Sequence, residues 1–282
     1  MIYAQECGSV ERSRHWRNAV PTLAGIYRYA IKSSAAEALA SAHVQLEGLR
    51  HDRRFMVVKP DGSFVTARRY PVLQTVTARF DGARLTVLHD DHVALAEACA
   101  DFDYQSFATR VWADDFSAWT TTQRLDAWFS RVLGEPVHLL WLGEQSPRYR
   151  DKIDTRVSFA DGYPLLLTSE ASLADLNART DGTHVMAQFR PNLVVADTAA
   201  FAEDTWQRIR IGPVTFRVDA PCARCVMITV DPARGQRRSD GEPMQTLLRY
   251  RKGDDNQVYF GQNLVAENEG AISTGDTVEI LA

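Results

Sequence analysis

Residues 219–235 read DAPCARCVMITVDPARG, and they hold two of the four cysteines in a chain of 282 residues. Cys222 and Cys225 stand three positions apart behind a proline, and β-branched residues follow them. Because β-branched side chains pack well in strands, we expect the pair to lead into a strand. Such a sparing use of cysteine, with two placed here, points to chemistry at sulfur.

Three kinds of sulfur site are compatible with this pair. A structural zinc site needs two more ligands, yet the chain has no second C-x-x-C, and its only close histidines, His89 and His92, are typical of a solvated turn. A dithiol redox site favours a first cysteine at a helix N-terminus, where the dipole stabilises a thiolate. The third is a single thiolate bound to a soft metal, and Arg224 between the cysteines favours the thiolate form.

Composition excludes several classes of protein. The chain has 32 Lys and Arg against 36 Asp and Glu, a net charge of −4, so it does not resemble a nucleic-acid binder, although local basic clusters can hold a small anion. No apolar stretch approaches about 18 residues, so we expect no transmembrane helix. Residues 1–22 lack the apolar segment of a secretory signal and are predicted to be a disordered extension. Four cysteines are too few for a disulfide framework, so we expect a reducing, cytoplasmic setting.

Most of the chain from about residue 23 alternates in short runs typical of strands. We expect hairpins over 54–69 and 75–90, which turn at Asp61-Gly62 and Asp81-Gly82. Single strands are expected over 25–31, 191–197, 213–220, 225–231 and 276–282. The predicted fold class is mainly β with some α (α+β), in barrels or sandwiches rather than a parallel βαβ sheet. A polar stretch near 136–150 divides the chain into predicted domains 23–142 and 143–282.

Two segments are predicted to be helical. Residues 120–136 begin with a threonine cap and end at Gly134 and Pro136, which predicts one helix. Its apolar face is formed by Leu125, Trp128, Phe129, Val132 and Leu133. Residues 163–180 predict a buried strand, a cap at Thr168 or Ser169, and a short helix.

The cysteine stretch resembles the signature of the MOSC family, the molybdenum-cofactor sulfurase C-terminal fold. Further motifs of that family follow in order: YAIKSS at 29–34, LRHDRRFMV at 49–57, FVTARR at 64–69, LLLTSEASLADLN at 165–177, FRPNLVV at 189–195, EPMQTLLRYR at 242–251 and FGQNLVAENEGAISTGDTVEIL at 260–281. The order is that of the branch containing the mitochondrial amidoxime-reducing component and the bacterial YcbX-type proteins. The resemblance implies an N-terminal MOSC β-barrel-like domain, a MOSC β-barrel domain, and a molybdenum cofactor held between them.

The resemblance also implies a set of site residues. Cys225 matches the molybdenum ligand and is the predicted catalytic residue, whereas Cys222 is equally well explained as a small buried thiol. Residues implied to hold the cofactor are Lys32, Ser33, Arg53, Asp161, Gly162, Tyr163, Thr168, Ser169, Arg190, Arg224 and Asn263. Thr66 and Arg68 are motif residues of the first domain. Each of these residues also has an ordinary explanation, as a surface charge, a turn residue or, for Thr168 and Ser169, a helix cap.

The implied activity is two-electron reduction of N-hydroxylated compounds, namely amidoximes, hydroxylamines and N-hydroxylated bases. Many bacterial relatives continue into a ferredoxin domain with a C-x4-C-x2-C motif, which this sequence lacks, so we expect no iron–sulfur cluster in this chain. Electrons are then expected from a separate protein, a flavin reductase with a ferredoxin or cytochrome-like carrier. Neither nucleic acid nor membrane is an expected partner. The alternatives are a carrier of molybdenum cofactor or persulfide sulfur without reductase turnover, and a zinc-stabilised β module.

Overall fold

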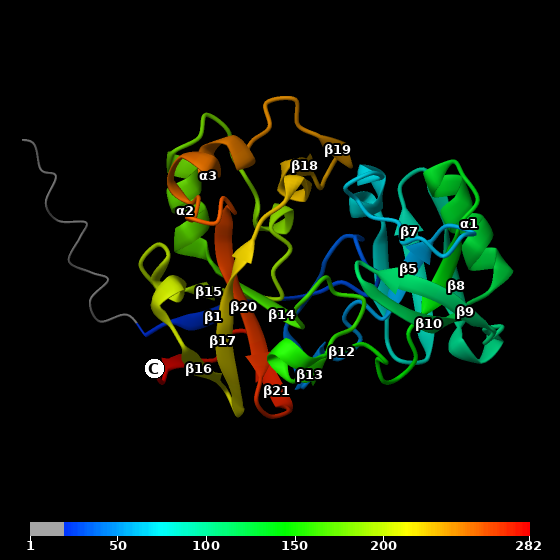
Figure 1. Cartoon of the computed structure of the whole chain (residues 1–282), viewed down its shortest axis with the longest axis horizontal. Helices are drawn as coiled ribbons and strands as arrows, with labels where there is room; N and C mark the ends of the chain where they lie inside the picture. The colour runs from blue at the N-terminus through cyan, green and yellow to red at the C-terminus, as the bar shows by residue number, and fades with distance from the viewer. Residues whose placement is uncertain (1–19) are drawn as a thin grey trace, which may run out of the picture.

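The computed structural model describes residues 20–282, and Figure 1 shows two β-rich halves side by side. The half on the right, drawn in cyan to green, comes from one continuous part of the chain, while the other combines a blue segment near the start of the chain with green, yellow, orange and red segments that come later. The fold is mainly β with some α, as the sequence predicts. Within residues 20–282, none of the helices combines the length and the apolar character needed to span a bilayer.

The larger half is built on an eight-stranded sheet with the strand order β2-β1-β15-β14-β20-β17-β16-β22. Its strands are β1 (Thr22–Arg28), β2 (Glu37–Leu39), β14 (Leu165–Ser169), β15 (Leu193–Ala196), β16 (Arg208–Ile211), β17 (Val214–Ala223), β20 (Tyr259–Ala266) and β22 (Val278–Ile280). All neighbours are antiparallel except β14 and β15. A bridge between Thr22 and Thr277 brings the two ends of the sheet together, as in a barrel. Its interior is a buried aliphatic core that includes Leu23, Leu167 and Leu264.

Strands from the start of the chain belong to this larger half. A three-stranded sheet pairs β3 (Ser41–Gln45) with β4 (Gly48–Leu49) and with β21 (Gly270–Ser273) near the C-terminus. Val44 and Leu49 are buried in the same core as Ile272. Residues 22–49 thus pair and pack with the second half of the chain, although the sequence grouped residues 23–142 together. The reason is that sheet partners are selected by complementary apolar faces rather than by position in the chain.

The smaller half holds two further sheets and a helix. The first sheet has the order β5-β11-β10-β9 and the second β6-β7-β8. Their strands are β5 (Phe55–Val58), β6 (Thr77–Phe80), β7 (Arg84–His89), β8 (His92–Ala98), β9 (Ser106–Val111), β10 (Asp114–Thr120) and β11 (His138–Trp141). The predicted helix is confirmed as α1 (Gln123–Leu133), capped by the Thr122 side chain and ended by Gly134 in the left-handed conformation.

Short elements complete the chain. They are α2 (Glu170–Ala178), α3 (Met244–Tyr250), β12 (Tyr149–Arg150), β13 (Thr155–Arg156), β18 (Val230–Asp231), β19 (Gln236–Arg237) and the 3₁₀ helices η2 (Pro71–Thr75), η3 (Cys99–Asp101), η4 (Asp151–Ile153), η5 (Met186–Gln188), η6 (Ala202–Thr205) and η7 (Val226–Thr229). The predicted strand, cap and helix over 163–180 are confirmed as β14, Ser169 and α2.

The first predicted hairpin is only half right. Its turn is present, because the Lys59 N–H donates to the Ser63 carbonyl, but the returning run pairs only at Phe64 and Val65. The chain then folds into a turn in which the Thr66 carbonyl accepts hydrogen bonds from the backbone N–H groups of Arg69 and Tyr70. This turn, rather than a strand, carries Arg68. The second predicted hairpin is confirmed by the pairing of β6 with β7.

Candidate functional site

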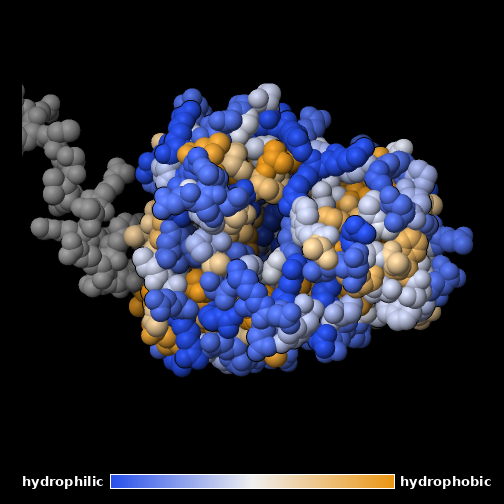
Figure 2. Space-filling view, viewed as in Figure 1, coloured by the Kyte–Doolittle hydropathy of each residue, from blue (hydrophilic) through white to orange (hydrophobic). Residues whose placement is uncertain are grey.

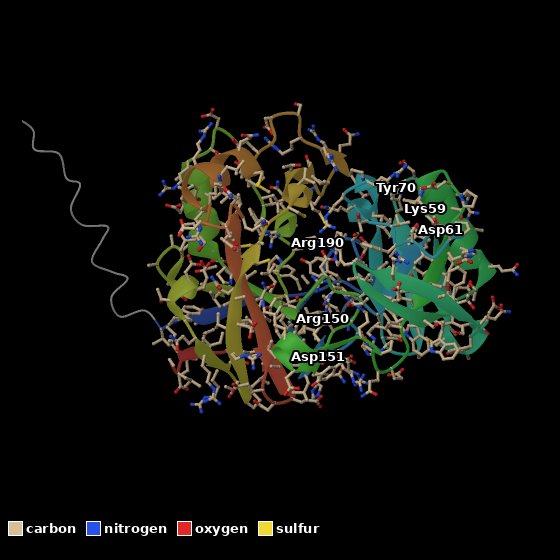
Figure 3. All side chains as sticks on the ribbon, in the orientation of Figure 1. Lys59, Asp61, Tyr70, Arg150, Asp151 and Arg190 are labelled. Atoms are coloured by element: carbon tan, nitrogen blue, oxygen red, sulfur yellow. The ribbon has the colours of Figure 1, made fainter. Side chains whose placement is uncertain are left out.

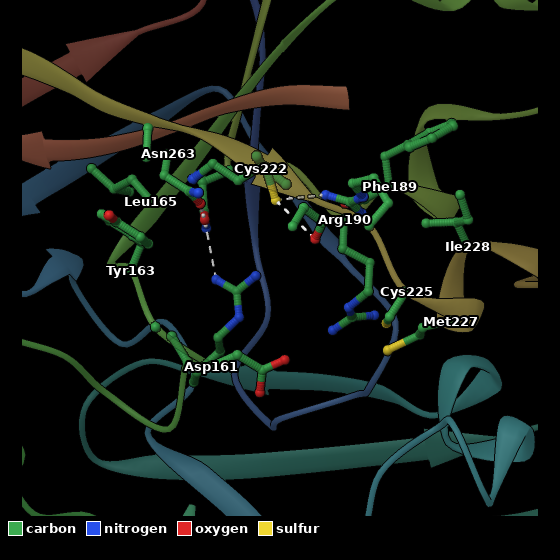
Figure 4. Close-up of a pocket in the computed structure, with 18 of the residues that line it drawn as sticks. Asp161, Tyr163, Leu165, Phe189, Arg190, Cys222, Cys225, Met227, Ile228 and Asn263 are labelled. Atoms are coloured by element: carbon green, nitrogen blue, oxygen red, sulfur yellow. Dashed lines mark hydrogen bonds between the residues drawn. The ribbon is translucent and has the colours of Figure 1, made fainter. Parts of the chain in front are cut away.

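A cleft of about 500 Å³ opens between the two halves, within the range of roughly 300–1,000 Å³ typical of ligand sites. Figure 2 shows the molecule hollowed there, and Figure 4 shows the side chains that line the cleft. The predicted site residues on its walls are Lys32, Ser33, Arg53, Asp161, Gly162, Tyr163, Arg190, Arg224, Cys225 and Asn263, joined by the motif residues Thr66 and Arg68. The fold thus brings together residues from distant parts of the chain, between positions 32 and 263.

The cysteine pair lies where β17 ends. Cys222 is in the last part of that strand, where the pairing with β20 is irregular, and Cys225 lies just before η7. The prediction of a strand over 225–231 is right only at Val230–Asp231, which form β18, and is wrong over the 3₁₀ helix η7. The Ile228 N–H donates to the Cys225 carbonyl and the Thr229 hydroxyl to the Val226 carbonyl, and these local bonds replace strand pairing. Both cysteines line the cleft, Cys222 from the end of β17 and Cys225 from the residue before the turn.

The alternatives for the pair can be weighed on this geometry. A dithiol site would place the first cysteine at a helix start, but Cys222 lies on a strand. Across residues 20–282, no group of three or more His, Cys, Asp or Glu side chains is arranged to hold a metal ion. His89 and His92 flank a hairpin turn, and the His89 ring accepts from the Asp91 N–H.

Arg224 connects the pair to the wall of the cleft. Its Nη1 donates to the Cys222 sulfur at 3.0 Å, and its Nη2 donates to the Phe189 carbonyl at 2.6 Å. Its Nε is buried and makes no hydrogen bond within residues 20–282. A buried N–H without a partner is costly, so this guanidinium retains a donor for a ligand.

Lys32 is the most deeply buried cation of the cleft, with 5% of its surface exposed. Its ammonium donates to the Phe159 carbonyl at 2.7 Å and pairs with the carboxylate of Asp161, half of whose side chain is exposed. Burial lowers the pKa of Lys32 to about 8, although Asp161 opposes the shift. Burial disfavours the Asp161 charge, but Lys32 and Arg68 outweigh it and hold the pKa of that carboxyl well below its usual range.

Two guanidinium groups lie over one buried aromatic ring. The guanidinium carbons of Arg190 and Arg53 are 4.2 and 4.7 Å from the centre of the Tyr29 ring. Arg190 donates from Nη1 to the Ser34 carbonyl at 2.6 Å, whereas its Nη2 is buried and has no partner within residues 20–282. Burial lowers the pKa of Arg190 to about 10, so the group is still cationic at neutral pH. Figure 3 shows Arg190 in the space between the halves.

Three residues of the cleft have strained backbone. Ser33, Arg53 and Arg190 have φ angles of 72°, 50° and 57°, in the left-handed region that side chains other than glycine rarely adopt. Each such residue costs on the order of 1–3 kcal/mol and persists where the surroundings enforce it, commonly at ligand sites. All three line the cleft.

The loop that carries Asp161 is held in place by hydrogen bonds on both sides of that residue. Arg148 donates to the Ala160 carbonyl at 2.7 Å, and the Tyr163 hydroxyl donates to Asp219 at 2.7 Å. Burial and the Asp219 charge raise the pKa of Tyr163 above its usual value, so the hydroxyl stays a donor. Asn263 is held by a 3.3 Å hydrogen bond to the Pro221 carbonyl. It follows Gly261, where a side chain would clash with the Leu167 carbonyl oxygen at 2.5 Å.

Thr168 and Ser169 are not among the residues that line the cleft, and their role at the cofactor stays a prediction. Both side chains are fully buried. The Ser169 oxygen accepts from the Ser172 N–H at 3.1 Å to cap α2, and its hydroxyl donates to the buried carboxylate of Glu203. The Thr168 hydroxyl donates to the Met186 sulfur. The simpler explanation of this motif, a helix cap, is the one the structure supports.

Several residues that line the cleft were not predicted from the sequence. They include Lys152, Gln188, Asn192, Met227 and Tyr259. Asn192 belongs to the FRPN motif, and its amide oxygen accepts from Arg53 at 3.1 Å, so the motif itself was the available signal. Nothing in the local sequence around Lys152 or Met227 distinguishes them from surface or core residues.

Comparison with known proteins agrees with this architecture. Residues 154–279 match the model of the MOSC domain, and residues 20–136 match that of the MOSC N-terminal beta barrel domain. The mitochondrial amidoxime-reducing component 1 of Danio rerio is 32% identical over 264 residues, covering 88% of this chain and 81% of that protein. The protein of the same name from Homo sapiens is 31% identical, covering 96% and 86%. The chain therefore belongs to the MOSC domain family, together with the amidoxime-reducing components.

Proposed function

We propose that this protein is a molybdenum-cofactor-dependent reductase of N-hydroxylated compounds. The observation that carries the proposal is a cysteine thiol, Cys225, on the wall of a cleft whose other charged groups are mainly cations. A thiolate suits a soft metal, and the cations suit an anionic organic group bound beside it. The molybdenum cofactor combines a sulfur-ligated metal with a pterin and a phosphate. The curated relatives are named for amidoxime reduction.

The cleft residues fit such a cofactor. Arg190 Nη2 and Arg224 Nε are buried donors that have no partner within residues 20–282, and both residues line the cleft. Lys32 adds a buried ammonium, and Arg53 adds a guanidinium in strained backbone. We assign Lys32, Ser33 and Arg53 to the phosphate, Arg190 to the pterin, and Arg224 to the part of the cofactor next to Cys225.

The reaction converts an N–OH group to N–H, consumes two electrons and two protons, and releases water. The bound cofactor supplies the two-electron redox couple and an acceptor for the oxygen. The chain supplies the metal ligand Cys225, cations that balance the charge of the cofactor, and a partly enclosed site. We propose amidoximes, hydroxylamines and N-hydroxylated bases as the substrate class, on the strength of the relatives' name.

Electrons are proposed to come from a separate redox protein. Support for this comes from the described residues 20–282, in which no group of three or more His, Cys, Asp or Glu side chains is arranged to hold a metal ion such as an iron–sulfur centre would need. A flavin reductase acting through a ferredoxin or cytochrome-like carrier would supply single electrons to the cleft. The cytoplasmic location predicted from the sequence remains part of this proposal.

A carrier of cofactor or of persulfide sulfur is the second candidate. The observation that favours it is the second thiol in the cleft, Cys222, whose sulfur lies 3.0 Å from the Arg224 guanidinium. A cation at that distance stabilises a thiolate or a persulfide anion. A carrier would release cofactor readily, show persulfide on a cysteine by mass spectrometry, and fail to reduce benzamidoxime.

The deciding experiment is metal analysis of protein expressed in a host that makes molybdenum cofactor. The wild type should carry near-stoichiometric molybdenum and reduce benzamidoxime with reduced viologen. Cys225→Ser should lose the metal or hold it without activity, while Cys222→Ser should keep both. Stoichiometric zinc without molybdenum in the wild type would disprove the proposal and favour a structural role for the pair.

A further inference from the structure

Arg68 makes a direct contact with the sulfur of Cys225. Its Nε donates to Sγ at 3.3 Å, and its Nη2 donates to the Asp161 carboxylate at 3.1 Å. Arg68 comes from the smaller half, whereas Cys225 and Asp161 come from the larger one. Figure 4 shows Asp161 and Cys225 on the walls of the same pocket. The Arg68 guanidinium therefore spans the cleft and donates hydrogen bonds to a thiol and to a carboxylate at the same time.

The position of this guanidinium is determined by its surroundings. Its carbon lies 4.5 Å from the centre of the Trp112 ring, which covers it at the tip of the β9–β10 hairpin. Trp112 has a φ of 56° and packs edge-on against Phe64. The Arg68 carbonyl accepts a hydrogen bond from Arg237 of β19. Side chain and backbone are thus both restrained, which a merely solvated arginine would not be.

We propose that Arg68 is a positioning residue that keeps its hydrogen bond to Cys225 when that sulfur binds the metal, and that it raises the reduction potential of the bound metal. The inference rests on the proposed function. An N–H···S hydrogen bond withdraws charge from a thiolate ligand, so less charge reaches the metal and the reduced state is favoured. Hydrogen bonding around a cysteine ligand tunes other metal centres in the same way.

Lysine is not equivalent at this position. The planar guanidinium of arginine holds its N–H donors in one rigid group. A single side chain can therefore donate to Sγ and to the carboxylate while it stacks on Trp112. A lysine ammonium keeps the charge but is a compact point charge on a flexible stem. Comparing Arg68→Lys with a neutral variant therefore separates the directed hydrogen bond from the charge.

The first test is a redox titration of the metal in the loaded protein. Arg68→Met removes both donors and keeps an unbranched side chain against Trp112. The matched control is Arg69→Met, because Arg69 is the neighbouring residue, is exposed and does not line the cleft. We expect Arg68→Met to lower the midpoint potential by about 30 mV. For a two-electron couple, this shift corresponds to a roughly tenfold change in the equilibrium constant of reduction. Arg68→Lys should recover only part of the shift, and Arg69→Met should not change the potential.

A second test needs no metal and remains decisive if Arg68→Met fails to hold the cofactor. In cofactor-free protein, the rate at which iodoacetamide alkylates Cys225 is followed by peptide mass spectrometry at neutral pH. Loss of the Arg68 donor should change the alkylation rate by about threefold or more, because the guanidinium contacts the attacking sulfur directly. Equal rates in Arg68→Met and Arg69→Met, or equal potentials in the two loaded variants, would overturn the inference. A wild type that carries no molybdenum would instead refute the proposed function, while the alkylation rates would still decide whether Arg68 acts on Cys225.

Discussion

The guanidinium carbon of Arg190 lies 4.2 Å from the centre of the Tyr29 ring, and Arg53 lies over the same ring at 4.7 Å. Tyr29 is 1% exposed, and its hydroxyl donates to the Pro191 carbonyl at 3.0 Å. One buried ring thus supports two of the cations proposed to hold the cofactor. The ring face attracts cations, which reduces the cost of keeping two like charges close together.

Replacing Tyr29 tests this support. Tyr29→Leu removes the aromatic face under both guanidinium groups, each such interaction being worth about 0.5–2 kcal/mol. We expect molybdenum content to fall severalfold and the protein to lose roughly 2–4 kcal/mol of unfolding free energy, since the cavity adds to the loss. Tyr29→Phe is the control, because it removes only the hydroxyl and should retain most of the metal. Equal metal content in the two variants would contradict the role of the ring.

The Lys32–Asp161 pair should matter for stability. Asp161→Asn keeps an oxygen that can accept from the Lys32 ammonium but removes the negative charge, so the buried ammonium is left with neutral partners only, the amide and the Phe159 carbonyl. A fully buried pair broken on one side costs about 3–5 kcal/mol, but Asp161 is half exposed, so solvent screening reduces the expected loss to about 1–2 kcal/mol. Urea denaturation gives the value. In the double variant with Lys32→Met, the two losses should not add, and strict additivity would show that the pair does not interact.

Anion binding to the cleft should weaken at alkaline pH. Burial lowers the pKa of Lys32 to about 8, below its ordinary value of 10.5, so the folded protein loses this charge as the pH rises through about 8. Loss of one cation should weaken sulfate binding by about fivefold between about pH 7 and pH 9.5, while the charge of sulfate stays constant. Calorimetric titration of the cofactor-free protein measures this change. Lys32→Arg stays charged across the range and should show a smaller dependence.

The protonation of Lys32 also affects the stability of the fold, and this effect depends on pH in the opposite direction to anion binding. Because the pKa of Lys32 is lower in the folded state, the unfolded chain binds more protons between about pH 8 and 10.5, and this group stabilises the fold as the pH rises there. For Asp161 the lowered pKa means that its stabilising contribution is complete above the ordinary value of 3.8 and is lost as the pH falls towards the folded pKa. Urea midpoints across these two windows, compared with Lys32→Met and Asp161→Asn, separate the two contributions.

Ser169 should affect stability without affecting the cofactor. Ser169→Ala removes the cap of α2 and a donor to the buried Glu203 carboxylate, which we expect to cost about 1–2 kcal/mol of unfolding free energy. Molybdenum content should be unchanged, because the side chain lies behind the cleft wall. Arg190→Gln is the contrasting variant and should reduce molybdenum content. Loss of metal in Ser169→Ala with little loss of stability would restore the role that the sequence predicted.

The electron source can be tested with the purified protein alone. We expect no benzamidoxime reduction with NADH as the only donor, and reduction with reduced viologen. A hydride donor needs a flavin or a similar acceptor, which the proposal assigns to a separate protein, whereas viologen donates single electrons directly. Robust turnover with NADH alone would show that the chain receives hydride itself.

Local features of the fold could be predicted from the sequence. The helix α1 with its Thr122 cap and Gly134 end, the turn of the second hairpin, and the cap at Ser169 all follow from neighbouring residues. They were predictable because capping, turn chemistry and apolar periodicity act within a few positions. Where β-branched residues suggested a strand over 225–231, local hydrogen bonds formed a 3₁₀ turn at Val226–Thr229, and only Val230–Asp231 are in a strand.

The candidate site, too, could be predicted from the sequence only in part. The sequence by itself determined the family pattern, the cysteine pair and most of the cations that line the cleft. Only the tertiary structure decided which of these residues meet. Lys32 contacts Asp161 across 129 positions, and Arg68 contacts Cys225 across 157. Such contacts depend on how the sheets close and how the two halves pack, because apolar periodicity specifies which face of a strand is buried but not which strand lies opposite.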